Sequence, residues 1–112
     1  QKDYQSIISI DSSFGRFPFK SFIEARLIVS SRVFGIVIDQ RKTDALVPVA
    51  DMLNHRLPKQ TSWFYCDHSR GFVVQSLKDI PPGSEIFDSY GHKCNSRFLL
   101  NYGFVLPDNM HN

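Results

Sequence analysis

Hydrophobic residues recur at roughly helical spacing in the first third of the chain, between residues 19 and 35. Pro18 stands just before this segment, and its fixed φ suits the first turn of a helix. The pattern predicts a helix over about 19–35, whereas residues 1–17 alternate only loosely and predict an irregular lead-in. The apolar positions of the predicted helix are Phe22, Ile23, Leu27, Val33 and Phe34.

After this helix, the pattern becomes that of short strands separated by turns. Residues 39–44 are polar and predict a loop, and residues 46–49 form an apolar run interrupted by Pro48, which argues against a central strand. Residues 62–67 and 72–77 are rich in aromatic and β-branched types on either side of a turn. This arrangement predicts a β-hairpin.

The last third of the chain predicts one more strand and one more helix. A turn rich in proline and glycine at residues 79–83 precedes a short strand at 85–90. Asn95 can cap a short helix that runs to Tyr102, and Gly103 is placed to end it. Helices and short strands without a repeated βαβ order predict the α+β fold class.

The composition excludes several classes of protein. The chain has 112 residues, of which 42% are hydrophobic, and this suffices for one small globular domain. Its net charge is only +2 and its basic residues are scattered, so we expect no nucleic-acid partner. No apolar run approaches the roughly 20 residues that span a bilayer, so we expect no membrane partner.

The two cysteines, Cys66 and Cys94, do not form a disulfide framework. They indicate a reducing, intracellular compartment and leave cytoplasm, nucleus and plastid open. Cys66 and His68, like His92 and Cys94, are separated by a single residue, whereas paired zinc ligands are usually separated by roughly two to four. We therefore expect no metal site.

Individual polar and aromatic residues have ordinary structural interpretations. A turn containing Asp51, Asn54 and His55 can be a capped turn with a satisfied histidine. Tyr90 and Tyr102, each followed by glycine, can be core aromatics beside turns. The order and spacing of these residues along the chain carry more information than any one of them.

Four separated segments resemble, in order and spacing, the SET domain of protein methyltransferases. The resemblance covers residues 18 to 106 and is to the subgroup that contains the RuBisCO large-subunit lysine methyltransferase and the actin-histidine methyltransferase. The segments are VSSRVF at 29–34, LVPVADMLNH at 46–55, LKDIPPGSEIFDSYG at 77–91, and residues 95–104.

The resemblance implies S-adenosyl-L-methionine as the cofactor. By resemblance, Arg32 and Asn54 would bind the amino-acid end of the cofactor, and the main chain of His55 would contact its adenine. Asp51 would orient Asn54 or the cofactor. The residue types suit this assignment, because a guanidinium holds a carboxylate through parallel hydrogen bonds and an amide can satisfy both ends of a zwitterion.

The resemblance also implies that a methyl group is transferred to a protein side chain, with Tyr90 as the catalytic tyrosine. Tyr102 would form a wall of the cofactor site, and Phe34, Ala50 and Tyr90 would line the substrate channel. Where the histidine-methylating member has tryptophan and asparagine, this sequence has Ala50 and Phe34, which favours a lysine substrate. Protein-histidine methylation and a non-catalytic, SET-like peptide-binding module remain the alternatives.

Parts of the resembled fold are missing from the sequence. Residues 1–38 match the end of an inserted region, 39–106 the C-terminal SET core, and 107–112 a tail toward an absent substrate-binding domain. The fold expected is a partial SET domain with a knot-like crossing near Asn54 and the Tyr90 segment. Because half a sheet leaves strand edges and apolar surface exposed, we expect the isolated chain to be inactive and to self-associate.

Overall fold

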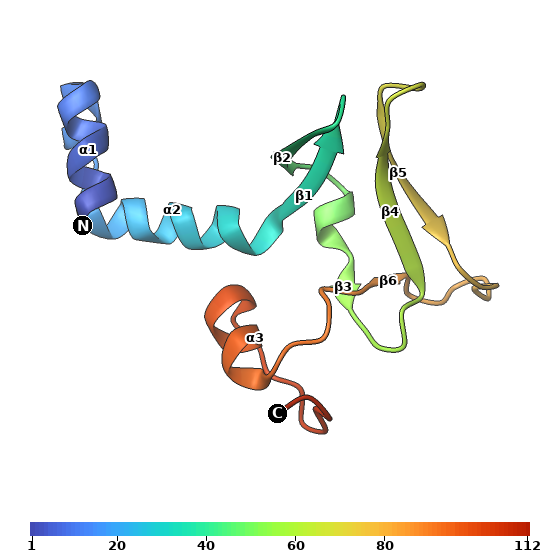
Figure 1. Ribbon diagram of the computed structural model, residues 1–112. Helices are drawn as coiled ribbons and strands as arrows, with labels where there is room; N and C mark the ends of the chain where they lie inside the picture. The colour runs from blue at the N-terminus through green and yellow to red at the C-terminus, as the bar shows by residue number, and fades with distance from the viewer. The chain divides into compact units, whose positions relative to one another are not determined.

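The structure is a computed structural model that describes residues 1–112 (Figure 1). The residues form two compact units, Gln1–Ser31 and Arg32–Asn112. The predicted division of the sequence at residue 38 stays a prediction. No helix in the structure is long and apolar enough to cross a membrane.

The first unit is helical. It contains α1 (Lys2–Ile10), the 3-10 helix η1 (Ser12–Arg16) and most of α2 (Phe19–Arg32). The prediction of an irregular lead-in was therefore wrong. The apolar residues Tyr4, Ile7 and Ile8 recur at helical spacing within α1, although none of its residues is fully buried.

Packing of aromatic rings joins the two α-helices of the first unit. The ring of Tyr4 lies 5.3 Å from that of Phe19 and 5.5 Å from that of Phe22 between ring centroids. The Tyr4 hydroxyl also donates to the carbonyl of Phe17. Between the two helices, the Asp11 carboxylate accepts a 2.9 Å hydrogen bond from the backbone N–H of Ser13 and caps η1.

The second unit begins with a hairpin that the sequence pattern did not predict. α2 ends at Arg32, and β1 (Val33–Ile38) pairs antiparallel with β2 (Arg41–Leu46). The helix is therefore three residues shorter than predicted, and the predicted polar loop is mostly a strand. The turn at Asp39 and Gln40 has positive φ at both residues, as two-residue hairpins require.

The second hairpin confirms the sequence prediction with bounds shifted by one residue. β4 (Thr61–Cys66) pairs antiparallel with β5 (Gly71–Ser76). The ring of Trp63 in β4 packs on Phe72 in β5 at 5.6 Å, and Phe34 of β1 stands 5.1 Å from both rings. These three rings hold the two hairpins together.

A short parallel pair connects distant parts of the chain. β3 (Asn54–His55), which follows the 3-10 helix η2 (Ala50–Met52), pairs with β6 (Phe87–Asp88). The strand predicted at 85–90 is thus only two residues long. The knot-like crossing stays a prediction.

The final helix, α3 (Asn95–Tyr102), ends as the sequence predicts, because Gly103 adopts the left-handed conformation with φ 80°. Its start differs from the prediction, since Cys94 occupies the N-cap position. The Asn95 side chain instead forms two hydrogen bonds, of 2.8 and 3.0 Å, with the backbone of Leu106. This pairing ties the helix to the segment that follows it.

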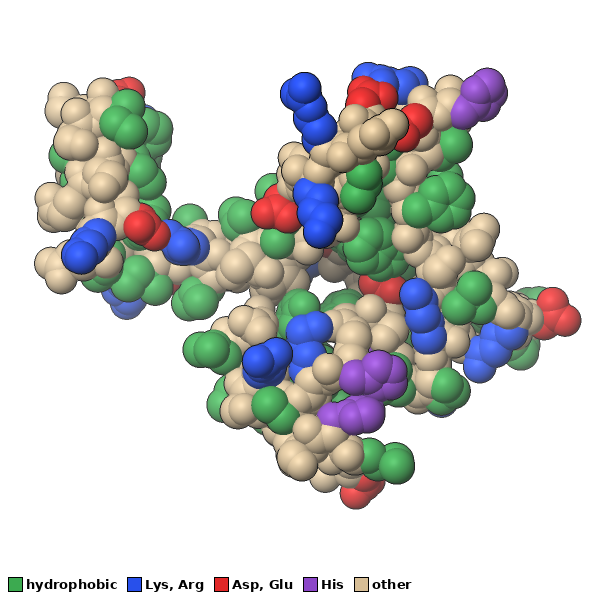
Figure 2. All heavy atoms as spheres, viewed as in Figure 1, with side chains coloured by type: hydrophobic (Ala, Val, Ile, Leu, Met, Phe, Trp, Pro, Cys, Tyr) green, Lys and Arg blue, Asp and Glu red, His purple; other side chains and the backbone are tan.

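The apolar core is small for a chain of this length. Ile36, 6% exposed, and Phe98, 1% exposed, are the two buried hydrophobic residues. Hydrophobic side chains are accordingly visible over much of the surface (Figure 2). The α+β class predicted from the sequence is confirmed, with short strands and few buried apolar side chains.

Candidate active site

A strained turn before β3 presents Asp51 to Arg32. Val49 has φ 75°, which is unfavourable for a β-branched residue, and the Asp51 N–H donates to the Val47 carbonyl at 3.1 Å. The Arg32 Nη1 atom then donates to the backbone carbonyl of Asp51 at 3.1 Å and to its carboxylate at 3.3 Å. The structure therefore brings together two of the predicted cofactor residues.

This ion pair remains accessible to a ligand. Half of the Arg32 side-chain surface is exposed, and Asp51 is more enclosed. In β3, the Asn54 amide nitrogen donates to the Glu85 carboxylate at 2.7 Å, which holds the amide against the chain before β6. A guanidinium, a carboxylate and an amide are together suited to a zwitterionic ligand.

Tyr90 is held from two directions by the segment of β3. Its hydroxyl donates to the Leu53 carbonyl at 2.6 Å, and its backbone N–H donates to His55 Nδ1 at 3.0 Å. Burial raises the pKa of the Tyr90 hydroxyl, so it stays protonated at neutral pH. Because its proton points to Leu53, its oxygen lone pairs are left to accept other hydrogen bonds.

His55 is a neutral positioning group in this arrangement. Burial lowers its pKa, and the nearby Lys93 ammonium lowers it further. Since Nδ1 accepts the Tyr90 N–H, the ring proton belongs on Nε2, which is buried without a hydrogen-bond partner. The imidazole therefore holds the Tyr90 backbone in place.

Aromatic rings from β3, the chain after β6, and α3 form one group, called here the tyrosine cluster. The rings of Tyr90 and Tyr102 are 4.8 Å apart, and Phe98 is 4.8 Å from His55. Burial raises the pKa of Tyr102, and the Asp88 carboxylate raises it further. The tyrosine cluster consists of His55, Tyr90, Phe98, Tyr102 and Phe104.

Phe34 and Tyr90, both predicted for the substrate channel, belong to different groups of aromatic rings. Phe34 packs with Trp63 and Phe72, in a ring group separate from the tyrosine cluster. Ala50 lines a largely apolar hollow of about 410 Å³ that Phe72 also lines. The structure thus places Phe34 and Ala50 near Phe72, and Tyr90 near Tyr102. That Phe34, Ala50 and Tyr90 line one substrate channel stays a prediction.

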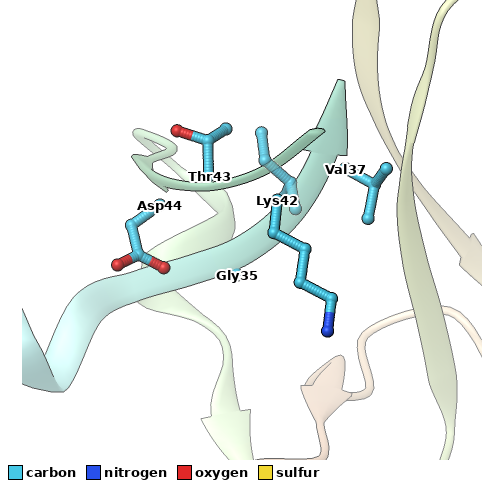
Figure 3. Close-up of a pocket in the computed structure, with 6 residues that line it drawn as sticks. Gly35, Val37, Lys42, Thr43 and Asp44 are labelled. Carbon is cyan, nitrogen blue, oxygen red and sulfur yellow. The ribbon is translucent and has the colours of Figure 1, made fainter. Parts of the chain in front are cut away.

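A second hollow, of about 440 Å³, lies in the first hairpin and contains none of the predicted site residues. Figure 3 shows the side chains of Lys42, Thr43 and Asp44 standing off β2 beside Gly35 of β1. This hollow, which Ile36 and Val37 also line, does not extend the candidate site.

Two charged residues near Tyr90 were missed in the sequence. Asp88 is 4% exposed; one carboxylate oxygen accepts from the Trp63 indole at 3.2 Å, and the other is buried without a partner. Lys93 donates to the Tyr90 carbonyl. A signal was available for both, because each lies within three residues of the predicted catalytic tyrosine.

Comparison with known proteins places this geometry in a family. The SET domain matches residues 4–91 of the chain. Ribosomal lysine N-methyltransferase set10 of Schizosaccharomyces pombe is 36% identical over 113 residues, covering 96% of this chain and 20% of that protein. Ribosomal lysine N-methyltransferase 1 of Saccharomyces cerevisiae is 31% identical over 98 residues, covering 84% of this chain and 16% of that protein.

A third relative is named for a different substrate. Actin-histidine N-methyltransferase of Danio rerio is 37% identical over 71 residues, covering 63% of this chain and 12% of that protein. The chain therefore spans about a fifth or less of the length of these relatives. Because the SET match covers most of the chain and the relatives are lysine and actin-histidine methyltransferases, the resemblance found in the sequence is confirmed: the chain belongs to the SET-domain family.

Proposed function

We propose that the protein containing this chain is an S-adenosyl-L-methionine-dependent protein-lysine N-methyltransferase. One observation carries the proposal beyond family membership. Tyr90 is fixed through Leu53 and His55, packs in a tilted arrangement beside Tyr102, and keeps its oxygen lone pairs free. A half-buried, protonated tyrosine of this kind can orient an amine and a polarised methyl group.

The residues present fit the proposed cofactor. The Arg32–Asp51 pair, with its two opposite charges 3.3 Å apart, complements the carboxylate and ammonium of an amino-acid end. Arg32, Asp51 and Asn54 would hold the amino-acid end, and the main chain of His55 would hold the adenine.

The chain's residues would act mainly by alignment. When bound, S-adenosyl-L-methionine supplies a methyl group on a sulfonium that leaves as a neutral thioether. Tyr90 would orient the incoming amine through its oxygen lone pairs, since its proton is committed to Leu53. The rings of Tyr90 and Tyr102 would exclude water and disfavour the charged form of the amine.

A lysine side chain is the proposed methyl acceptor, and the names of the two yeast relatives point to a ribosomal protein as the substrate. Ala50 and Phe34 support a lysine substrate. Ala50 stands where the histidine-methylating member has the larger tryptophan, and Phe34 stands where that member has the polar asparagine. Histidine methylation is the second candidate, because the Danio rerio relative is 37% identical over 71 residues.

Methyl transfer tests the proposal directly. The purified protein that contains this chain would be incubated with a labelled methyl donor, ribosomal proteins and actin, and the modified residue identified by mass spectrometry. We expect label on lysine of a ribosomal protein and a strong loss in the Tyr90→Phe variant. Label on actin histidine would favour the second candidate, and no transfer to any protein would refute both.

The isolated chain is expected to bind the cofactor product weakly or not at all. Its small core and exposed apolar side chains support this expectation. Calorimetric titration of residues 1–112 with S-adenosylhomocysteine, together with light scattering for self-association, measures both properties. Tight stoichiometric binding by a monomer would contradict the view that the chain needs the rest of its protein.

A further inference from the structure

Lys93 places a positive charge against the two tyrosines of the candidate active site. Its ammonium donates to the Tyr90 carbonyl and lies 5.8 Å from the ring centroid of Tyr102. Gly91 allows this folded-back position, because a Cβ at that residue would lie 3.1 Å from Lys93 Nζ and its φ is 90°. The local chain is therefore shaped to hold the ammonium there.

The charge of Lys93 is not cancelled by a carboxylate. The four salt bridges of the structure join other cations to acids, and the guanidinium of Arg32 is paired with Asp51. Lys93 has only a carbonyl and a ring face as partners. The positive charge of Lys93 therefore acts on neighbouring groups without being offset by a paired carboxylate, reduced only by solvent screening.

Other ionisable groups also act on this site. Asp88, Arg32 and Asp51 contribute to the potential at Tyr90, and Asp88, Lys93 and His92 contribute at His55. The sign of the total electrostatic potential at the site depends on all of these charges. The difference made by Lys93 alone has a fixed sign, because a positive charge always disfavours a second positive charge nearby.

We propose that Lys93 determines the charge state of the substrate, its ammonium favouring the neutral, nucleophilic form of the amine that enters beside Tyr90 and Tyr102. This inference rests on the proposed methyltransferase function and adds an electrostatic contribution to the effect of burial among the tyrosine rings. A free lysine amine is protonated at neutral pH and has no lone pair for attack. Burial among rings removes part of that proton affinity, and Lys93 removes more.

The effect already operates on a group within the chain. Lys93 is the second largest cause, after burial, of the lowered pKa of His55. A substrate amine that entered beside the Tyr102 ring, from whose centroid Lys93 Nζ lies 5.8 Å, would experience a repulsion of the same sign. With unit charges roughly 6 Å apart and partial screening, we expect a shift of about one pH unit in the amine's titration.

The test is the pH dependence of kcat at saturating substrate, which reports ionisations in the enzyme–substrate complex. Lys93→Gln removes the charge and Lys93→Arg retains it as the matched control. We expect the rising limb of the Gln profile to move about one pH unit upward, with turnover recovering at high pH, while the Arg profile keeps its position. A structural defect would lower kcat at every pH without moving the limb.

A second measurement needs no turnover. The ring signals of His55 can be titrated by NMR in the protein without substrate, where Lys93→Gln should raise the pKa of His55 and Lys93→Arg should not. An unmoved His55 titration refutes the electrostatic premise. Turnover with an unshifted kcat profile in Lys93→Gln refutes the inference alone, and absence of turnover in the unmodified protein refutes the proposed function together with it.

Discussion

Removing the Tyr90 hydroxyl is the most direct perturbation of the candidate active site. The Tyr90→Phe change keeps the ring and its 4.8 Å packing against Tyr102, but it deletes the 2.6 Å hydrogen bond to the Leu53 carbonyl. It also deletes the oxygen that would orient the amine and the methyl group. The variant therefore tests the contribution of the hydroxyl while the aromatic ring stays in place.

The expected decrease in kcat can be estimated from the hydrogen bond that the Tyr90 oxygen would make to the reacting groups. A hydrogen bond to a group with developing charge is worth about 1.5–3 kcal/mol, which corresponds to about a 10- to 100-fold decrease in kcat. An unpaired, partly buried Leu53 carbonyl should in addition lower the free energy of unfolding by about 1 kcal/mol. We therefore expect a variant that folds and turns over slowly.

Tyr102→Phe is the matched control, because Tyr102 shares the ring environment of Tyr90 but does not donate to Leu53. Steady-state methyl transfer and urea denaturation would be measured for both variants. We expect Tyr102→Phe to keep kcat within a few-fold of the unmodified protein, since its ring is retained. Equal losses in the two variants, or full activity of Tyr90→Phe, would refute the role assigned to the Tyr90 hydroxyl.

Three further changes probe the core, the ion pair and the imidazole. Phe98→Ala should lower the free energy of unfolding by about 3–5 kcal/mol in urea denaturation, because Phe98 is 1% exposed, whereas Phe64→Ala at an exposed site should cost far less. Arg32→Lys should weaken cofactor binding measured by calorimetry, with kcat less affected: Nη1 alone makes both contacts to Asp51, and an ammonium lacks the second guanidinium nitrogen that is left for a ligand carboxylate. Folding lowers the pKa of His55 below its ordinary value of 6.5, so protonation of this imidazole favours the unfolded chain. The free energy of unfolding should therefore fall as the pH drops through and below 6.5. His55→Gln should remove this part of the pH dependence, as measured by urea denaturation at several pH values.

Local signals explain which parts of the fold the sequence could predict. The β4–β5 hairpin has strand-forming residues on both sides of one turn, and Gly103 supplies the left-handed residue that ends α3. The β1–β2 hairpin lacks such signals. Its second strand begins with exposed polar residues, and its turn uses Asp39 and Gln40 where glycine or asparagine is common.

The candidate site was predictable only in part, because residue identity fixes chemistry more readily than position. Arg32 and Asp51 were identified by resemblance, and the structure brings them into contact. Phe34 was assigned to the channel from its place two residues after Arg32, but the pairing of β1 with β2 directs it toward Trp63. Side-chain direction in a strand depends on a register that sequence spacing alone does not reveal.

The position of Tyr90 depends more on polar contacts than on the apolar core. The Thr61 hydroxyl, at the start of β4, donates to the Phe87 carbonyl at 2.9 Å. The side-chain oxygen of Gln60, the residue before β4, accepts from the Phe87 N–H at 3.1 Å. Both backbone groups of this β6 residue are therefore held by side chains. His55 then holds the N–H of Tyr90 two residues after β6 ends. Hydrogen bonds fix a backbone more narrowly in direction than apolar packing does. A two-residue strand can therefore position the Tyr90 hydroxyl although few apolar side chains are buried around it.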